Sequence, residues 1–523
     1  MRYIVTAAQM KEADMRTIHD VGIPSLVLME RAALSCINIM KQEGVDISNP
    51  LIVCGSGNNG GDGFAIARLL SEEGIFADVV LVGRMESRSE ETRTQMEILR
   101  NLGVSVGNCL PDREYSVIID AVFGIGLTRP IEGTYKEIIE QMNSYDAEKV
   151  AVDIPSGICA DTGKVLGTAF KADITVTFAY AKRGHIFYPG SELCGQVFVM
   201  PIGIEAPGLG KVQDVSFALD MEDIWKLKPE RPADSNKGCF GKMLLVAGSK
   251  GMCGAAYLSA GAAYAAGAGL VRVYTEESNR EILQGLLPEA VLTTYDERDG
   301  ESAVRQLAEL LDWADVACMG CGLGKGRTAV MLTEALLEFN RKPCVLDADA
   351  LNILGENHGL MEILKSAKAD YILTPHMKEM SRLAGHTVQE WKKERVELVR
   401  DFVKEYPAVC VLKDARTLAA AREKQLFINT SGNAAMAKAG AGDVLAGLTA
   451  GLLAQGLPGW EAAVLGVYLH GLAGERAAAD KGMYSVLARD IIDGIGMTWK
   501  SLEEQHEDLQ QNTCSHRFGR SKA

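Results

Sequence analysis

Short apolar runs alternate with stretches of helical periodicity through the first two hundred residues. The runs are PLIVC, ADVVLVG, YSVIIDAVFG, KVAVDIP, ADITVTFAY and GQVFVMP. This alternation predicts βαβ units and a mainly parallel sheet. Residues 6–43 precede these runs and carry helical periodicity, which Gly22, Ile23 and Pro24 divide into two predicted helices. We expect these helices to cover the sheet or a neighbouring subunit.

A second α/β series follows a charged, proline-bearing stretch around residues 214–237. Its strand-like runs are GKMLLVAGS, GLVRVYT, VACMG, CVLDADALNIL, YILTPH and AVCVLKDA. They repeat the class of the first series but none of its motifs, so we expect two unrelated α/β domains rather than a duplication. The predicted division is a domain over 1–215, a linker over 216–235 and a domain over 236–500. The polar residues 501–523 are expected to form a mobile tail.

The amino-acid composition disfavours some classes of binding partner. The 523 residues hold 69 acidic and 54 basic side chains, a formal charge of −15 that disfavours nucleic acid and anionic membrane surfaces as partners. The twelve cysteines are scattered, which suits a reducing compartment, and residues 252–271 are too rich in Ala and Gly for a membrane span. We therefore expect a cytoplasmic protein. The apolar helices before Leu51 and the Ala/Gly-rich helices favour a homo-oligomer.

The segment GSGNNGGDG stands between a predicted strand and a predicted amphipathic helix, the arrangement in which glycines let a ligand approach a helix N-terminus. Gly55, Gly57 and Gly60 match GxGxxG. The acidic residue that binds ribose in NAD dehydrogenases is absent, because the next strand ends in Gly83 and Arg84. A purely structural turn is the alternative, but it would not require the oxygen-bearing side chains that the loop also holds.

Two further strand ends should meet this loop at one edge of a parallel sheet. The first presents Asp120 and the loop 124–130, and the second presents Asp153 and Ser156. A carboxylate that follows an apolar strand is costly to bury without a cation, a ligand or hydrogen bonds. The alternative is that each carboxylate caps the turn that follows it.

Together, GSGNNGGDGFAIAR, DAVFGIGLTRPIEG, VAVDIPSG and KRGHIFYPG resemble the NAD(P)H-hydrate epimerase family over about residues 1–215. The resemblance implies a Rossmann-like three-layer domain that interconverts the R and S hydrates at C6 of the nicotinamide ring, with Asp153 as the catalytic proton-transfer group beside the ring. It assigns potassium to Asn59, Asp120 and Ser156, oxygen ligands of the kind that a weakly hydrated cation takes. The implied substrate-binding residues are Asn58, Asn59, Gly60, Gly61, Asp62, Gly124, Ile125, Gly126, Leu127, Thr128, Arg129, Pro130 and Asp153.

The strongest signal in the second half is SGNAAMAKAGAGDVLAGLTAG. Glycines surround Asp443 where a helix should begin, so backbone N–H groups there could hold an anion while Asp443 takes a proton from a substrate hydroxyl. The alternative is an N-cap Asp on a packing helix of small residues. The GAGD motif resembles the ribokinase-like superfamily.

The motifs GKMLLVAGS, MGCGLGKG, LDADALNIL, LTPHMKEMSRL and VLKDARTL occur in the order found in ADP- or ATP-dependent NAD(P)H-hydrate dehydratases, over about 236–500. This resemblance implies that Asp443 deprotonates the C6 hydroxyl, that ADP supplies the phosphoryl group while Mg²⁺ neutralises the nucleotide phosphates, and that phosphate then leaves. It implies hydrate contacts for Ala256, Gly322, Gly324, His376 and Asp443. It implies nucleotide contacts for Lys413, Asp414, Ala415, Arg416, Thr417 and Gly442. A buried histidine tied to backbone is the alternative for His376.

The sequence departs from the family pattern in a few places. LMERAA lacks an Asn-Ala-Gly ending, and Ala435 and Ala441 stand where Gly and Thr are expected. Cys318 and Cys321 form a CxxC without a second ligand pair, which disfavours a metal or redox role. Together the motifs predict a bifunctional repair enzyme for hydrated NAD(P)H. The alternative is a small-hydroxyl, vitamin-precursor kinase fused to a non-catalytic dinucleotide-binding module.

Overall fold

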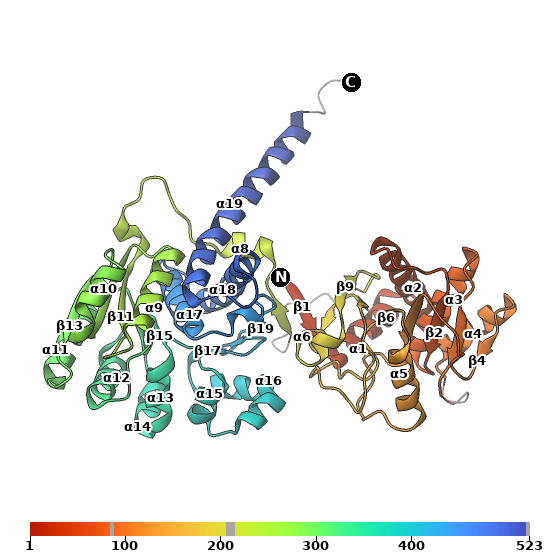
Figure 1. Ribbon diagram of the computed structural model, residues 1–523, viewed down its shortest axis with the longest axis horizontal. Coiled ribbons are helices and arrows are strands. Elements are labelled where there is room, and N and C mark those ends of the chain that lie inside the picture. Colours follow the sequence, from red (N-terminus) through yellow and green to blue (C-terminus); the bar gives the residue numbers. More distant parts are fainter. Residues whose placement is uncertain (84–87, 205–214, 519–523) are drawn as a thin grey trace. The chain divides into compact units, whose positions relative to one another are not determined.

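The chain divides into two compact units (Figure 1). The computed structural model describes residues 1–83, 88–204 and 215–518, and the two units span residues 2–216 and 217–523. We call them the N-terminal unit and the C-terminal unit.

The N-terminal unit is built on a parallel sheet, as the alternating apolar runs predict. Its described strands follow the order β4-β3-β2-β5-β6-β7-β9, and every neighbouring pair is parallel. The strands are β2 (Pro50–Cys54), β3 (Asp78–Leu81), β4 (Val106–Gly107), β5 (Val117–Ala121), β6 (Glu148–Val152), β7 (Ile174–Phe178) and β9 (Gln196–Met200).

Helices cover both faces of this sheet and bury alternate residues of each strand. Along β2, Ile52 packs into the core beneath α2 (Ser25–Gln42), α3 (Asn58–Glu72) and α4 (Glu90–Asn101). Its neighbour Leu51 packs into the core beneath α5 (Thr134–Ser144) on the opposite face. Two apolar faces explain why the strands are nearly continuous apolar runs. This three-layer arrangement confirms the predicted fold.

The segment before the sheet contains the two helices that the sequence predicts. Helix α1 (Ala7–Arg16) begins with a Thr6 capping box and continues into a π-helical turn at Thr17–Val21. Gly22 ends the turn with φ 83°, in the left-handed region that favours glycine. The sequence did not reveal the shorter elements of this unit, which are β1 (Arg2–Val5), β8 (Ala181–Lys182), α6 (Arg183–Ile186) and α7 (Gly190–Leu193).

The C-terminal unit also has a mainly parallel sheet. Its described strands run β13-β12-β11-β14-β15-β16-β17-β18-β19, with only the β17–β18 and β18–β19 pairs antiparallel. Three of these strands, β13, β18 and β19, were not predicted. The bounds are β11 (Lys242–Val246), β12 (Leu270–Glu276), β13 (Val291–Tyr295), β14 (Val316–Met319), β15 (Cys344–Leu346), β16 (Tyr371–Leu373), β17 (Ala408–Leu412), β18 (Leu418–Ala420) and β19 (Leu426–Ile428).

Small residues let two helices of this unit pack very closely. A Cβ added at Gly447 of α17 (Ala441–Ala454) would lie 2.0 Å from the Ser259 carbonyl oxygen of α9 (Cys253–Ala266). The Ala/Gly-rich residues 253–266 therefore form a helix that packs closely against α17. The other helices are α10 (Arg280–Leu286), α11 (Gly300–Trp313), α12 (Arg327–Phe339), α13 (Ala348–Glu356), α14 (His358–Lys365), α15 (Met377–Ala384), α16 (Val388–Glu405), α18 (Gly459–Lys481) and α19 (Ala488–Phe518).

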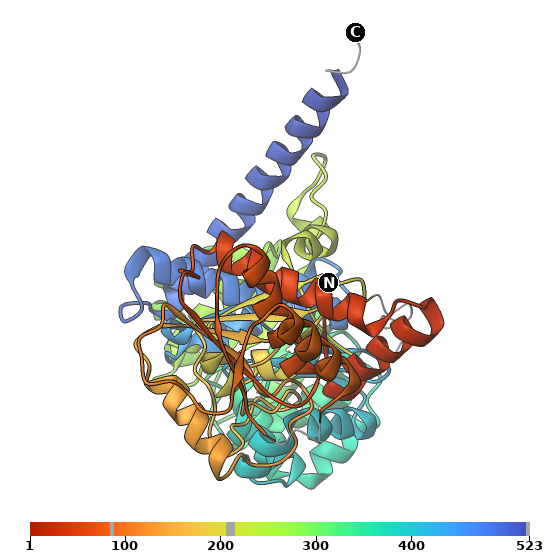
Figure 2. The same cartoon turned by 90° about the vertical axis from the view of Figure 1, so that its right-hand side faces the viewer.

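Two predicted stretches contain more secondary structure than expected. The proposed linker 216–235 contains β10 (Ser216–Ala218) and α8 (Met221–Leu227), whose apolar residue Ile224 is buried. The last helix, α19, extends away from the other helices of its unit in both views (Figure 2) and is helical to Phe518. The mobility of residues 501–523 stays a prediction, as do the exact domain bounds.

The packing of α3 on the sheet can be tested at Phe64. This ring is 0% exposed in the core that holds α3 against β2, whereas Phe76, after the same helix, is 72% exposed. Phe64→Ala should lower the free energy of unfolding of the N-terminal unit by about 3–5 kcal/mol, because it leaves a cavity. Phe76→Ala is the matched control and should change it by under about 0.5 kcal/mol. Hydrogen exchange of the backbone amides of the N-terminal unit, monitored as urea is raised, measures the free energy of unfolding of both variants. Equal effects of the two substitutions would contradict the packing of Phe64 against the sheet.

Candidate active sites

The glycine loop after β2 is shaped by close backbone contacts. A Cβ at Gly55 would lie 2.0 Å from the Val122 carbonyl oxygen, and one at Gly60 would lie 1.9 Å from the Gly55 carbonyl oxygen. No side chain fits at either position, so the loop can turn tightly into α3, whose N-cap is Gly57. The predicted strand, loop and helix are therefore confirmed.

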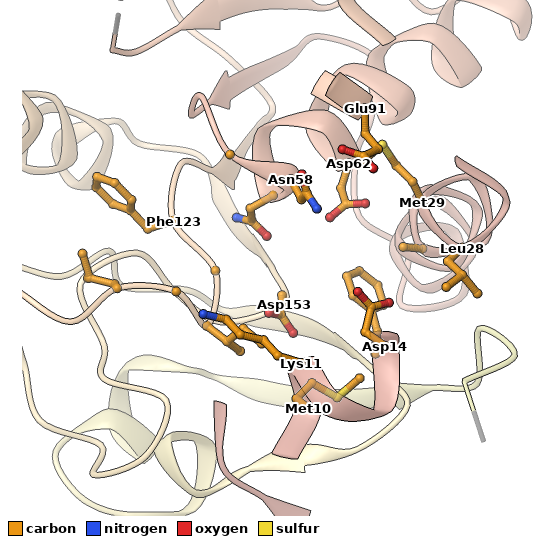
Figure 3. A pocket seen from close by; sticks show the side chains of 18 of the residues that line it. Met10, Lys11, Asp14, Leu28, Met29, Asn58, Asp62, Glu91, Phe123 and Asp153 are labelled. Carbon is orange, nitrogen blue, oxygen red and sulfur yellow. The ribbon is translucent and has the colours of Figure 1, made fainter. Parts of the chain in front are cut away.

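A cavity of about 560 Å³ opens beside this loop (Figure 3). It is lined by the predicted loop residues Asn58, Asn59 and Asp62, by Asp153, and by residues 124–129. Helices α1 and α2 contribute further lining, including Lys11, Asp14 and Met29. Three predicted residues are not among the lining: Gly60 and Gly61 are buried behind the loop, and Pro130 is exposed.

Asp153 follows β6 and is held in a polar cage. Its backbone has φ 66°, and its Oδ1 accepts hydrogen bonds from Lys182 Nζ at 2.7 Å and Thr177 Oγ1 at 3.0 Å. Burial alone would raise the pKa of this carboxyl, but the buried Lys182 ammonium and these hydrogen bonds lower it below its usual range. Asp153 is therefore an ionised carboxylate at the edge of the cavity.

His185 completes the cage from the backbone side. Burial, together with nearby Lys182, lowers the pKa of its imidazole to about 4, so the ring is neutral. Its Nδ1 accepts from the Lys182 backbone N–H at 3.0 Å, which leaves Nε2 protonated to donate to the Asp153 carbonyl oxygen at 2.9 Å. The ring thereby fixes the strained backbone that aims Asp153.

Asp120 and Ser156 are joined directly beneath the same loops. The Asp120 carboxylate accepts from the Ser156 backbone N–H and hydroxyl, each at 2.7 Å, and burial raises its pKa to about 6. Asn59 lies against the adjacent loop, since a Cβ at Gly124 would come within 3.1 Å of Asn59 Oδ1. The Asn59 Nδ2 atom is buried and has no hydrogen-bond partner among the described residues.

The C-terminal unit gathers a second group of acids at the start of α17. Gly440 adopts φ 90° before the helix, and the Asp443 carboxylate follows. One ligand atom from each of Asp443, Asp347 and Cys321 lies within 4.8 Å of the other two. Burial and the neighbouring Asp347 raise the pKa of Asp443 to about 6. Asp443 is thus ionised near neutral pH but retains a strong affinity for a proton.

Lys413 forms an ion pair with Asp347, one of these two carboxylates. Its Nζ lies 2.6 Å from Asp347 Oδ1, and a Cβ at Gly442 would come 3.3 Å from that Nζ and 3.7 Å from Asp347 Oδ2. Burial opposes the charge on Lys413, yet Asp347 and Glu379 raise the pKa of its ammonium. The ion pair is therefore placed beside the GAGD turn.

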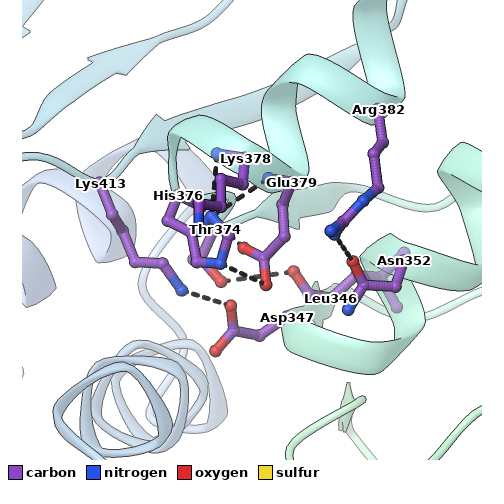
Figure 4. A network of polar contacts seen from close by, with 9 residues as sticks. All are labelled: Leu346, Asp347, Asn352, Thr374, His376, Lys378, Glu379, Arg382 and Lys413. Carbon is purple, nitrogen blue, oxygen red and sulfur yellow. Dashed lines mark hydrogen bonds and ion pairs between the residues drawn. The ribbon is translucent and has the colours of Figure 1, made fainter. Parts of the chain in front are cut away.

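His376 is a helix cap rather than a buried core histidine (Figure 4). Its Nδ1 accepts from the backbone N–H groups of Lys378 and Glu379 at 3.1 Å, at the start of α15. Burial and Lys413 lower the pKa of the imidazole, which keeps Nδ1 free to accept. The side chain is half exposed. The alternative for His376 was wrong about burial but right about the tie to backbone, and a contact with substrate stays a prediction.

Comparison with known proteins places both halves of the chain. A family model described as NAD(P)H-hydrate dehydratase matches residues 243–496, and one described as YjeF-related protein N-terminus matches residues 25–184. The bifunctional NAD(P)H-hydrate repair enzyme of Moorella thermoacetica is 37% identical over 97% of this chain and 98% of its own length. The enzyme of that name from Escherichia coli is 34% identical, with 91% and 90% covered. The chain belongs to the family of bifunctional NAD(P)H-hydrate repair enzymes.

A solved structure of an ADP/ATP-dependent NAD(P)H-hydrate dehydratase from Bacillus subtilis is 29% identical, with a TM-score of 0.48 over 54% of this chain and 97% of that one. The family confirms the predicted resemblance for both halves, and the structure confirms an α/β fold with a mainly parallel sheet in each. In the described part of the chain, none of the helices combines the length and apolar character that crossing a lipid bilayer requires.

Most of the remaining residues predicted for the second site lie on loops near strand ends, and one, Ala256, lies in a helix. Asp414 forms an ion pair with Arg395 at 3.0 Å, Arg416 donates to the Thr430 carbonyl oxygen at 3.2 Å, and Thr417 donates to the Asp414 carbonyl oxygen at 3.2 Å. Gly322 and Gly324 both have positive φ, of 60° and 77°, in the loop after β14. Ala256 is fully buried in α9. Their ligand contacts, and those of Ala415, stay predictions.

Sequence reasoning missed three residues that shape the two sites: Lys182, Asp347 and Cys321. Lys182 stands in the motif YAKRGH, and only its complete burial reveals that its charge serves Asp153. Asp347 was visible as the acid that ends the strand run CVLDAD, the same signal that marked Asp120 and Asp153. Cys321 was noticed only within CxxC, whereas the structure places its sulfur beside Asp443.

The backbone contact at the first glycine loop gives a stability test. Gly60→Ala should lower the midpoint of thermal unfolding of the N-terminal unit by several degrees, because the new methyl group meets the Gly55 carbonyl. Gly57→Ala is the control, since a Cβ there meets nothing within 4 Å and the backbone is extended. Calorimetry of the two variants compares them, and an unperturbed Gly60→Ala protein would refute the required close approach.

Proposed function

We propose that the chain repairs hydrated nicotinamide nucleotides at two separate sites. The N-terminal site interconverts the R and S forms of NAD(P)H hydrate, and the C-terminal site dehydrates the S form to NAD(P)H at the expense of ADP. The observation that carries this proposal is that each half has its own family match and its own carboxylate at a glycine-rich turn. An epimerase that feeds S hydrate to a neighbouring dehydratase allows both hydrates to be repaired.

At the N-terminal site, Asp153 is the proton-transfer group. Inversion at C6 requires a base or acid within hydrogen-bond reach of the ring substituent. Lys182 and Thr177 keep Asp153 ionised and fixed in direction, so it is pre-organised to accept a proton from a group in the cavity. The loop residues Asn58, Asp62 and 124–129 would hold the dinucleotide around it.

The residues beneath this cavity fit a potassium ion. Asn59, Asp120 and Ser156 supply oxygen atoms, and no thiol or imidazole is among them. The buried Asn59 amide nitrogen, which lacks a partner, calls for a hydrogen-bond acceptor, which an oxygen of the bound dinucleotide would supply. When bound, potassium would hold the loop after β2, which carries Asn59, against the ends of β5 and β6. Hydrogen bonds between Asp120 and Ser156 join the end of β5 to the segment after β6.

At the C-terminal site, Asp443 deprotonates the C6 hydroxyl of the S hydrate. The oxygen then attacks the terminal phosphoryl group of ADP, and AMP leaves; loss of phosphate from C6 and of a proton from C5 restores the ring. Backbone N–H groups at the start of α17 stabilise the transferring charge. Mg²⁺ would enter with the nucleotide and neutralise its phosphates, and Asp347, whose Oδ2 faces Gly442, fits such a cation.

Two other features of the proposal rest on composition and surface. The exposed apolar residues Leu26, Val27 and Leu34 of α2 support the predicted homo-oligomer. The cytoplasmic location rests on the scattered cysteines, which suit a reducing compartment. The acidic charge disfavours nucleic acid and anionic membrane surfaces as partners. The preference for ADP over ATP rests on the family resemblance alone.

The two sites are tested by a crossed pair of variants. Asp153→Asn should lower the rate of R-to-S conversion at least about 100-fold while dehydration of S hydrate with ADP is unchanged. Asp443→Asn should do the reverse, and its affinity for ADP should fall only slightly. Chromatography of the two hydrates follows the first reaction, and absorbance of the reduced nicotinamide follows the second. Each variant is the folding control for the other.

Three results would contradict parts of this proposal. Unchanged epimerisation in Asp153→Asn would remove its catalytic role, and unchanged dehydration in Asp443→Asn would remove the base. Failure of the unaltered protein to regenerate NAD(P)H from S hydrate and ADP would favour the small-hydroxyl kinase.

Raising the pH from 5 to 7 should increase the rate of dehydration, because the pKa of Asp443 is raised to about 6 and the base is mostly ionised only above that pH.

The potassium site is tested by stability rather than turnover. Replacing Na⁺ by K⁺ at equal ionic strength should raise the thermal midpoint of the N-terminal unit, because only the folded state assembles the ligands. Asn59→Ala should abolish this difference between the two salts. Asp46→Asn, a change at an exposed residue of the same unit, should preserve it. An equal midpoint in both salts for the unaltered protein would remove potassium from the proposal.

A further inference from the structure

A second carboxyl group, Asp62, lines the same cavity as Asp153 but has a contrasting environment. Asp62 lies in the first turns of α3, after Asn58, whereas Asp153 follows β6, and both line the cavity (Figure 3). Both carboxylates are directed into the cavity in this view. Two carboxyl groups that face one ligand space from different elements can act on opposite faces of a ring.

The partners of the two carboxyl groups differ sharply. Asp153 is bonded to the Lys182 ammonium, but no described residue donates a hydrogen bond to the Asp62 carboxylate or forms an ion pair with it. Burial raises the pKa of Asp62 well above its usual range, and the charges of Asp153 and Asp14 raise it further. Asp62 therefore holds a proton more strongly than Asp153 does.

The other titratable groups around Asp62 do not cancel the rise in its pKa. From α1 come Asp14 and Lys11, and from α4 comes Glu91, which accepts a hydrogen bond from Ser25. Lys182 is already engaged by Asp153. Two further groups, the thiols of Cys36 and Cys54, have raised pKa values because they are buried, and they stay neutral. Of the other two cations that line the cavity, Lys11 stands on the helix that also carries Asp14, and Arg129 is exposed on the loop after β5.

We propose that Asp62 is the general acid of the epimerase site and that Asp153 is its general base on the opposite face of the nicotinamide ring. This inference rests on the proposed epimerase function and gives Asp62 a catalytic role in place of a binding role alone. Separate acid and base groups suit an inversion, because one face must release an oxygen and the other must receive one.

The reaction balances with these two groups and one water molecule. Asp62 gives its proton to the C6 hydroxyl, the C6–O bond breaks with its electron pair on the leaving water, and the N1 lone pair forms a C6=N1 double bond. A water on the other face then bonds to C6 through oxygen, returns the double-bond pair to N1, and loses its proton to Asp153. One proton leaves Asp62 and one reaches Asp153, so the oxidation state of the ring is unchanged.

The test compares Asp62→Asn, Asp62→Glu and Asp14→Asn in the full chain, with ADP omitted. Asp62→Asn should lower kcat for epimerisation at least about 100-fold with little change in KM, because the amide binds but cannot donate an acidic proton. Asp62→Glu retains an acid and should recover part of kcat. Dehydration of S hydrate with added ADP should be unchanged in all three variants, and the thermal midpoint reports folding of the N-terminal unit.

The pH dependence separates an acid from a binding residue. Activity of the unaltered protein should fall at alkaline pH as Asp62 loses its proton, and Asp62→Asn should lack this fall. Asp14→Asn removes a negative charge that raises the pKa of Asp62, so its alkaline fall should move to lower pH. A rise in KM with kcat unchanged in Asp62→Asn, or an unshifted profile in Asp14→Asn, would overturn the acid role.

An isotope measurement tests the broken bond directly. Epimerisation in water enriched in ¹⁸O should place one labelled oxygen at C6 for each inversion, after the enzyme-free background is subtracted. Inversion without label would overturn cleavage of the C6–O bond and with it the need for Asp62 as an acid. If the unaltered protein shows no epimerisation at all, the proposed function fails, whatever the variants do.

Discussion

The close backbone contact at the carboxyl ends of the parallel strands is the constraint on which the first site depends. Gly55 meets the Val122 carbonyl, and Gly60 meets the Gly55 carbonyl, at separations that no Cβ could tolerate. These contacts bring the loop after β2 against the loop after β5, so that side chains from different strands share one space. Packing therefore fixes the site before any ligand contributes, and the glycines are required by geometry rather than by flexibility.

The two sites then use opposite arrangements of charge around their central carboxylates. Asp153 has a direct cation in Lys182, so it is ionised and poorly basic, yet it is precisely aimed. Asp443 has no such direct partner in its cluster: the Lys413 ammonium pairs with Asp347, and the negative charge of Asp347 raises the pKa of Asp443. In each site, the basicity of the central carboxylate thus depends on whether the lysine pairs with it or with a neighbouring carboxylate.

The sequence predicts the parts of this structure that depend on local pattern. The apolar runs locate β2, β5, β6 and β7, and Gly22 marks the end of a helix, because each is determined by neighbouring residues. Short strands such as β8 and β18 were missed, since their few residues carry no periodicity. The motifs located Asp153, Asp443 and Lys413, but they did not predict which carboxylate each lysine pairs with, because an ion pair depends on tertiary contacts such as the one between Lys413 and Asp347, 66 residues apart.

The sequence predicts Asp62 only as a binding residue, because its partners, too, are set by tertiary contacts. Its motif marks a loop that contacts a ligand, but a motif does not specify whether a carboxyl group holds a proton. That property follows from what surrounds the group: Asp153 is matched by Lys182, and Asp62 faces Asp153 and Asp14 with no described donor of its own. A second ionised carboxylate beside Asp153 would add repulsion in a buried space, so burial and the charge of Asp153 both strengthen the hold of Asp62 on a proton. The buried lysine sets the base, and burial beside that base sets the acid.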